Sequence, residues 1–284
     1  MADPTRVLLV TKGHPFEREP FFAVFDANAD ISWRHVEHPE VRKRFNPEGL
    51  VDVDVVVFYD MPGVEFTRSD PPVRFTDPEP GYVAGFEAVM EHGTGLVFLH
   101  HAIAAWPTWS RYAEVVGGRF HYQPAELAGV AYPDSGYRHG VTHTVEVVDP
   151  DHPIVDGLPA LFEITDEVYL SPVFVESVVP VLRSQHRFTE DEFFSAGLAI
   201  RGRRSCAEGW SHPPGSDLVV WVKHAGNSPV AYIQFGDGPD TYADPNYRKV
   251  LANAVRWAAS TEAHTWARAR SRSLERSATG RSGE

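Results

Sequence analysis

Cysteine and long apolar runs are nearly missing from this sequence. Cys206 is the one cysteine among 284 residues, so no disulfide can form within the chain and no cysteine cluster can bind zinc. No apolar run approaches the roughly 20 residues that a membrane-spanning helix needs. The first residues, MADPTRVLLV, lack the basic segment and the long apolar stretch of a secretory signal. We therefore expect a cytoplasmic protein with no membrane partner.

Basic side chains are outnumbered by acidic ones. The chain has 26 lysine and arginine residues against 39 aspartate and glutamate residues, which gives a net charge of −13. Such a surface repels a phosphate backbone, so we expect no nucleic-acid partner. Hydrophobic residues make up 43% and charged residues 23%, as is typical of a globular protein with a full core. The length suits one large α/β domain.

Three common catalytic motifs are absent. The sequence contains no GxSxG elbow, no Walker A loop and no GxGxxG dinucleotide fingerprint. Cys206 lies in the polar stretch RRSCAEGW, which is not at a strand-to-helix elbow, so we do not expect it to act as a nucleophile. Serine hydrolase, P-loop and Rossmann functions therefore lack support.

Strands and helices alternate over the first 120 residues. Continuous apolar runs at 6–11, 54–60 and 95–99 predict strands that are covered on both faces, and the alternating run from Ile31 predicts an edge or second strand. One helix is predicted to begin near Glu17. A second is predicted to run from Tyr82 to Gly93, and a third to end at Gly117. This order indicates a parallel sheet between helices. Later strands, which start at residues 141, 179, 218 and 229, are expected to add antiparallel pairs.

The remaining segments are predicted to be loops, one clear helix and a tail. Residues 66–81 are rich in proline and aspartate and predict a long loop. Asp244 and Pro245 are suited to begin a helix with an apolar stripe up to Ala258. We expect a single domain over residues 1–260, followed by a polar, Arg/Ser-rich tail, 261–284. The tail is expected to be solvated or frayed, with a basic docking helix as the alternative.

Ionisable groups directly follow three of the predicted strands. Open parallel sheets bind ligands at the carboxyl ends of their strands, and these ends carry His14, Asp60 and the pair His100-His101. Histidine suits proton transfer or metal ligation near neutral pH. Because neighbouring residues of an extended chain point to opposite sides, we expect one of the two adjacent histidines to face the site. The alternative is that they cap a helix, fill a polar gap or belong to an ordinary turn.

Other candidate residues lie in the middle of the chain. ITDEVYL, 164–170, places Asp166 and Glu167 beside Tyr169, and paired acids can perform acid–base work. The pattern alone favours a loop cap and a solvated charge there. Trp106 belongs to a group of aromatics that could line a pocket or pack in the core. His139 and His143 lie in a β-rich segment, where four residues span ~13 Å, so we reject them as a metal pair.

With these residues in view, the chain resembles the ThuA-like (trehalose utilisation) family over roughly residues 5–260. The segments that carry the resemblance are, in order, VLLVTKGHPFE, GLVFLHHA, VGGRFHYQP, DPDHPIVDGLP, ITDEVY and AYIQFGDGPDTYADPNYRKVLANAVRWAA. The resemblance implies a three-layer α/β sandwich of the flavodoxin-like, class I glutamine amidotransferase-like kind. The elbow that holds a cysteine in those enzymes holds His100-His101 here, so cysteine-dependent amidotransferase chemistry is not expected. Many family members have a Gly-His pair after the last strand, where this chain has Asp237 as a replacement acid or ligand.

The family name implies a function in carbohydrate metabolism. Our leading hypothesis is isomerase- or hydrolase-type acid–base chemistry on a sugar or an oxidised-sugar metabolite. His100 or His101 would be the base, Asp166 or Glu167 would supply a carboxylate, and His14 would bind substrate. Asp60, Trp106, Tyr169 and Asp237 complete the predicted substrate site. A zinc-like divalent metal on His14, His100 and His101 is left open, as are a homo-oligomer and a non-catalytic sugar-binding or complex-forming module.

Overall fold

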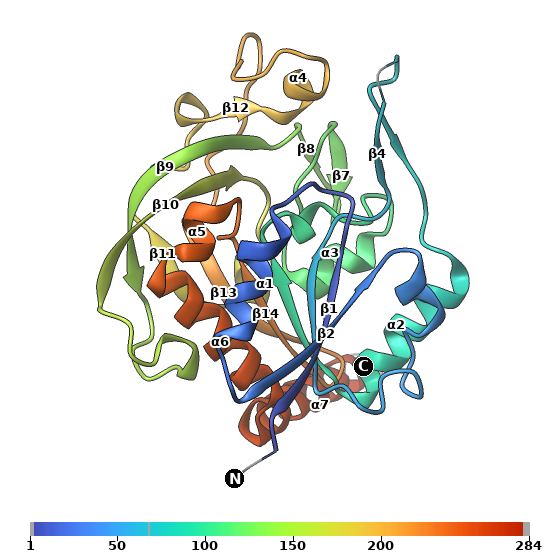
Figure 1. Cartoon of the computed structure of the whole chain (residues 1–284). Coiled ribbons are helices and arrows are strands. Elements are labelled where there is room, and N and C mark those ends of the chain that lie inside the picture. The colour runs from blue at the N-terminus through green and yellow to red at the C-terminus, as the bar shows by residue number, and fades with distance from the viewer. Residues whose placement is uncertain (1–2, 68, 281–284) are drawn as a thin grey trace.

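The computed structural model describes residues 3–67 and 69–280, which form a central sheet flanked by helices (Figure 1). The ten-stranded sheet has the order β10-β9-β11-β13-β14-β6-β3-β1-β2, with β12 paired to β9. Five neighbouring strands are parallel. They are β1 (Thr5–Lys12), β2 (Ile31–Glu37), β3 (Val55–Asp60), β6 (Gly95–Leu99) and β14 (Ser228–Ile233). The predicted parallel sheet and the edge position of the segment from Ile31 are confirmed.

The helices cover both faces of the sheet. One face carries α1 (Arg18–Asp26), α5 (Pro239–Ala243) and α6 (Pro245–Ala259), and the other carries α2 (Pro80–His92) and α3 (Ser110–Val116). Strand β1 explains the continuous apolar run, because Leu9 packs into the core under α1 and α6 while Leu8 packs into the opposite core. As predicted, the Asp244 carboxylate caps α6 by accepting hydrogen bonds from the Asn246 and Tyr247 backbones.

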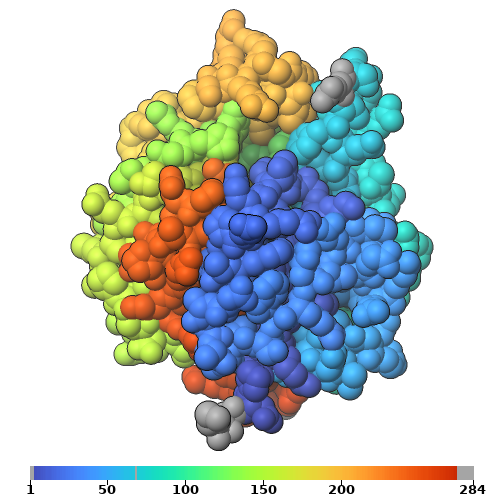
Figure 2. Space-filling model, in the orientation of Figure 1, coloured from blue at the N-terminus to red at the C-terminus, as the bar shows by residue number. Residues whose placement is uncertain are grey.

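The second part of the sheet is antiparallel, also as predicted. It comprises β9 (Gly136–Val147), β10 (Leu161–Leu170), β11 (Val179–Ser184), β12 (Phe194–Ser195) and β13 (Leu218–Ala225). Strand β13 joins this part to the parallel strands by pairing with β14. The helix α1 and the helix α5 come from opposite ends of the sequence but lie side by side on the surface (Figure 2). The candidate functional residues described below lie at the ends of the strands near α1 and α5.

Short elements outside the main sheet differ from the prediction. The segment 66–81 is not one long loop, because β4 (Val64–Phe66) and β5 (Val73–Phe75) pair as a hairpin and α2 already begins at Pro80. Burial of the Val73 side chain stabilises this hairpin in spite of the surrounding prolines. A second hairpin, β7 (Ala125–Leu127) with β8 (Val130–Tyr132), and the short helix α4 (Ala196–Ile200) had no clear sequence signal.

The expected solvated tail is wrong for most of its length, because Thr261–Gly280 form helix α7; residues 281–284 lie outside the described ranges. Ala263 and Ala267, four residues apart, are fully buried, and Trp266 packs against Trp257 with 5.7 Å between ring centroids. The small side chains of the two alanines let α7 approach β13 and β14 closely. Composition alone did not reveal this contact. No helix in the described ranges is both long and apolar enough to cross a membrane.

The buried alanine stripe predicts that α7 contributes to stability. We expect Ala267→Asp to lower the free energy of unfolding by about 2–4 kcal/mol, because it would bury an unpaired carboxylate against the sheet. Ala269→Asp is the matched control, since Ala269 is exposed on the same helix. Urea unfolding of both variants measures the difference. Equal stability of the two variants would show that α7 does not pack on the sheet in solution.

Candidate active site

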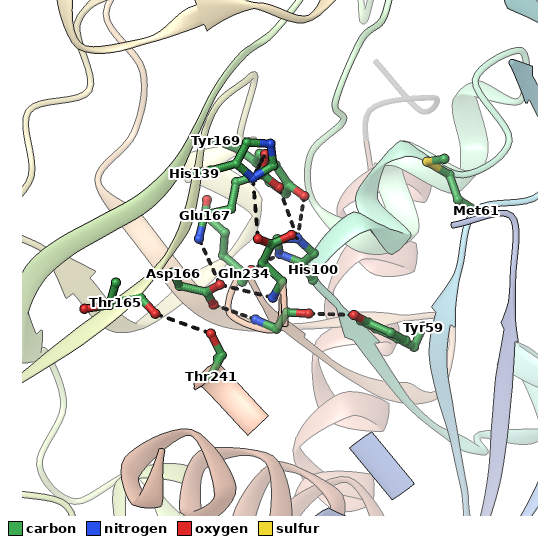
Figure 3. Close-up of polar contacts among 12 residues, drawn as sticks. Tyr59, Met61, His100, His139, Thr165, Asp166, Glu167, Tyr169, Gln234 and Thr241 are labelled. Atoms are coloured by element: carbon green, nitrogen blue, oxygen red, sulfur yellow. Dashed lines mark hydrogen bonds and ion pairs between the residues drawn. The ribbon is translucent and has the colours of Figure 1, made fainter. Parts of the chain in front are cut away.

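Four ionisable side chains meet at the carboxyl ends of β6 and β14 (Figure 3). His100 directly follows β6 and begins the 3-10 turn η2 (His100–Ala104). Asp237 follows β14, Glu167 lies on β10, and His139 lies on β9. We call these four residues the acid–histidine cluster. The cluster joins the parallel and antiparallel parts of the sheet at the edge where open α/β sheets bind ligands.

His100 is the most enclosed member of the cluster. Its backbone has a φ of +48°, a left-handed conformation that turns the chain sharply at the end of β6. Its Nδ1–H donates a 2.7 Å hydrogen bond to the Gln234 carbonyl, so Nε2 is the nitrogen that faces the cluster. Nε2 lies 3.2 Å from Glu167 Oε2, 3.6 Å from Asp237 Oδ1 and 2.8 Å from the Tyr169 hydroxyl.

Charge in the cluster favours a protonated His100. Burial alone would lower the pKa of His100, but its hydrogen bonds to Asp237 and Glu167 outweigh burial and raise that pKa to about 10. Burial likewise opposes ionisation of Asp237, yet hydrogen bonds to His100 and His139 hold the pKa of Asp237 well below its ordinary value. The result is an imidazolium held between two carboxylates, which is a site able both to give and to accept a proton.

His139 closes the cluster on the solvent side. Its Nδ1 lies 3.2 Å from Glu167 Oε1 and 3.4 Å from Asp237 Oδ2, so each carboxylate bridges the two histidines. The hydrogen bond to Asp237 raises the pKa of His139, against a smaller opposing effect of burial. With 61% of its side chain exposed, His139 is the member that solvent reaches most easily.

A β-bulge aims His139 at Glu167. Across the β9–β10 pair, Val141 lies opposite Asp166 and Arg138 opposite Val168, so His139 and Gly140 together face the single residue Glu167. Gly140 has a φ of +63°, a conformation that glycine adopts at little cost. Bulges of this kind redirect a side chain beside a functional site.

Asp166, for which we predicted a catalytic role, lies beside the cluster and binds backbone groups rather than its histidines. Its buried carboxylate accepts backbone hydrogen bonds from Gly236 at 2.6 Å, Asp237 at 3.1 Å and Glu167 at 2.8 Å. The Tyr59 hydroxyl donates a further 2.6 Å hydrogen bond to the Gly236 carbonyl. The expectation of a loop cap with a solvated Glu167 is also wrong, because both acids lie buried in β10. The Asp166 carboxylate and the Tyr59 hydroxyl together hold the loop that carries Asp237.

A family model described as trehalose utilisation, ThuA, matches residues 6–258. This chain belongs to the ThuA family. Its fold is similar to a ThuA-like protein from Parabacteroides merdae ATCC 43184 (TM-score 0.65, 13% identity, 91% of each chain covered). A ThuA-like protein from Bacteroides uniformis ATCC 8492 (0.60, 18%, 92% of this chain and 94% of that one) and the cytoplasmic protein STM3548 from Salmonella typhimurium (0.55, 12%, 89% and 98%) are also similar. None of the curated proteins matches the chain.

The side chains of the adjacent histidines of this ThuA-family chain point in different directions, as expected. His101 is the one that points away from the acid–histidine cluster. Its buried ring stacks on His14, with 4.5 Å between centroids, and lies 4.3 Å from the Tyr59 ring centroid. Burial lowers the pKa of His101 well below its ordinary value, and neither ring nitrogen makes a hydrogen bond to a residue that the structure describes. His101, for which we predicted a catalytic role, therefore forms no hydrogen bond to an acidic side chain among the described residues. His14 lines a hollow of about 430 Å³ beside Phe16 and Arg18.

Asp60 and Trp106, which we predicted for the substrate site, contact His38 and Arg42 instead of the acid–histidine cluster. Asp60 is buried and forms a 2.7 Å pair with His38 Nε2. The Trp106 ring packs edge-on against His38 and under the Arg42 guanidinium, at 5.9 Å and 5.2 Å between centres. Trp106 packs within the core beneath α2, and the His38 ring that pairs with Asp60 lies 6.0 Å from Tyr82 of the same helix. The carboxyl-end rule pointed to the edge of the sheet where the acid–histidine cluster lies, but it could not tell which side chains at that edge point into the core.

His139 is the cluster member that the sequence did not identify as a site residue. It was considered only together with His143, and His143 proves to be buried beside Ser184, with 2.6 Å between Nδ1 and Oγ. The signal that could have found His139 is the pairing of two consecutive strands, which brings it opposite Glu167. A hairpin register with a bulge at Gly140 was needed to make that prediction.

The cluster also offers a set of metal ligands. His100, Glu167 and Asp237 each present one ligand atom, and these atoms all lie within 4.8 Å of one another. Imidazole with carboxylates is a donor set that zinc accepts, and the hydrogen bond from Nδ1 to the Gln234 carbonyl holds the His100 ring with Nε2 toward the carboxylates. His14 and His101, which the sequence left open as ligands beside His100, do not belong to this set.

Proposed function

We propose that this chain is an enzyme that performs acid–base chemistry, of isomerase or hydrolase type, on a sugar or an oxidised-sugar metabolite. The observation that carries the proposal is the placement of His100 Nε2 within 3.6 Å of two carboxylates, Glu167 and Asp237, at the ligand-binding edge of the sheet. Membership of the ThuA family, described as trehalose utilisation, supports a carbohydrate-related role. A cluster of mutually paired acids and histidines can take a proton from one substrate atom and return one to another.

Each residue has a distinct part in this proposal. Glu167 contacts both histidines and is the base that accepts a proton from a substrate carbon or from an attacking water. His100, held protonated, donates to the substrate oxygen on which charge develops. Asp237 keeps His100 charged, and His139 exchanges protons with solvent. Asp166 and Tyr59 hold the Asp237 loop in place.

A divalent cation is the cofactor that the donor set supports. His100, Glu167 and Asp237 would hold it, and it would supply Lewis-acid polarisation of a sugar oxygen. A proton on His100 and a metal ion would compete, because both neutralise the same two carboxylates. With the ion bound, His100 and Glu167 would serve as ligands, so the acid and base roles given above belong to the metal-free cluster, and Tyr169 and Gln234 would still fix the His100 ring.

An NMR assay in D2O tests the function. Purified protein is incubated with trehalose and with keto-sugars derived from it. Isomerase-type chemistry would introduce deuterium beside the carbonyl, and hydrolase-type chemistry would release single sugars. We expect His100→Gln to abolish the reaction and His101→Gln to retain most of it, because His100 contacts the carboxylates whereas His101 stacks on His14.

Two outcomes would contradict this assignment. Binding of the sugar without any turnover would favour the alternative, a non-catalytic sugar-binding module. Full activity of His100→Gln would show that the reaction takes place outside the acid–histidine cluster. Thermal unfolding of both variants checks that each keeps its fold, since both histidines are buried.

A further inference from the structure

A second hollow, of about 580 Å³, lies at the opposite edge of the sheet. It is lined by α3, by the 3-10 turn η4 (Val175–Ser177), by the end of β13 with the turn that follows it, and by the middle of α7. Strand β14 begins beside it at Ser228 and ends at Ile233, near the acid–histidine cluster. Six residues of strand span about 20 Å, so this hollow is separate from the cluster.

Three cations from different elements meet in this hollow: Arg111 of α3, Lys223 of β13 and Arg270 of α7. Lys223 is only 8% exposed, and its ammonium donates a hydrogen bond to the Glu114 backbone carbonyl. Burial, followed by Arg111, lowers the pKa of Lys223 to about 8. The hollow therefore holds a cation in an environment that disfavours its charge.

All three cations lower the pKa of the neighbouring His224. Burial is the largest cause that lowers its pKa, and Lys223, Arg270 and Arg111 each add to it. Its Nδ1–H donates to the Gly226 carbonyl at 3.2 Å, so a ligand would meet Nε2. His224 lines the same hollow as the three cations, which places its ring beside any anion bound there.

Three carboxylates accompany the three cations, and in the part of the chain that the structure describes Arg111 is the cation that two of them pair with. Arg111 pairs with Glu87 at 3.2 Å and with Glu114 at 3.0 Å, and the exposed Glu176 also lines the hollow. Arg270 lies over the Trp266 ring, 4.8 Å from its centroid, which holds the guanidinium in place. Lys223 and Arg270 form no ion pair with a carboxylate among the described residues, so these two cations are left to meet an anion in the hollow.

We propose that this hollow binds a phosphate monoester of a polyhydroxylated metabolite, the chemistry of a sugar phosphate. Arg270 and Lys223 would contact the phosphate, since guanidinium and ammonium groups are strong phosphate donors. The hollow is much larger than one phosphate and falls within the size range of small-molecule sites. The hydroxyls of Ser177 and Ser271 line it and suit the hydroxyls of a sugar body.

Calorimetric titration of the full chain tests this site. The probes are glucose 6-phosphate, inorganic phosphate and glucose. We expect glucose 6-phosphate to bind more tightly than either of the others. Arg270→Ala should weaken its binding about tenfold or more, because a charge-assisted contact is lost. Arg268→Ala, which removes the same charge from the same helix outside the hollow, should leave binding unchanged.

A second readout does not depend on any variant. Bound phosphate should raise the pKa of His224, as followed by the ring proton shifts of the wild-type chain, since an anion favours the charged imidazole. Lys223→Met extends the test to a buried position, with thermal unfolding to check its fold.

Three results would overturn the assignment. They are no binding of glucose 6-phosphate, equal losses of affinity in Arg268→Ala and Arg270→Ala, or equal affinities for inorganic phosphate and glucose 6-phosphate. None of these results touches the acid–histidine cluster, so the proposed enzymatic function stands or falls separately.

Discussion

Replacing Glu167 by glutamine is expected to reduce turnover of the sugar metabolite at least a hundredfold. Glu167 is the carboxylate that contacts both histidines, through Oε2 to His100 and Oε1 to His139. General acid–base groups contribute about 10²–10⁴ to the rate, and glutamine cannot accept the proton. Glutamine keeps the size of the side chain, and Asp237 still contacts His100, so the chain should remain folded. The NMR assay gives the rate, and thermal unfolding reports the fold.

Glu163→Gln is the matched control for this prediction. Glu163 lies on the same strand, β10, but its side chain is exposed and outside the cluster. We expect this variant to keep the rate of the wild type, because it removes the same charge without touching His100 or His139. A Glu167→Gln variant as active as the control would remove Glu167 from the mechanism.

The fold could be predicted because local patterns and packing agree. A continuous apolar run such as Val7–Val10 has to be buried on both faces, which requires helices on both sides of a sheet. The cap at Asp244 marks the start of α6 in the sequence as it does in the structure. The helix α7 could not be predicted in this way, since Ala263 and Ala267 are too small to give an apolar signal yet large enough to pack.

The site could be predicted only in part, because its residues come together through tertiary contacts. The rule that ligands bind at the carboxyl ends of parallel strands located His100. It also selected Asp60, whose side chain turns into the core to pair with His38. His139 depends on a bulge in the β9–β10 pair, which is a property of two strands together. Asp166 was selected because aspartate is a common catalytic residue type. In the structure its carboxylate instead accepts a backbone hydrogen bond from the loop that carries Asp237.

Metal binding is the second expected result with a large effect. Chelator-treated wild-type protein should take up one equivalent of zinc, because three ligand atoms already lie within 4.8 Å of one another. His100→Ala and Asp237→Ala should each lower the affinity at least a hundredfold, since each removes a direct ligand, and removal of even an outer-shell partner costs about 10–100-fold. Elemental analysis after dialysis and a zinc titration give the stoichiometry and the affinity.

His143→Gln is the control for zinc binding, because His143 is a buried histidine on β9 that contacts Ser184 and lies outside the ligand set. Loss of zinc from the His100 and Asp237 variants, but not from this control, would place the ion at the acid–histidine cluster. Full uptake by the His100 variant would place the ion elsewhere. Failure of the wild type to bind zinc would leave the proton on His100 as the charge that neutralises Glu167 and Asp237, and catalysis would then depend on Glu167 without a zinc ion.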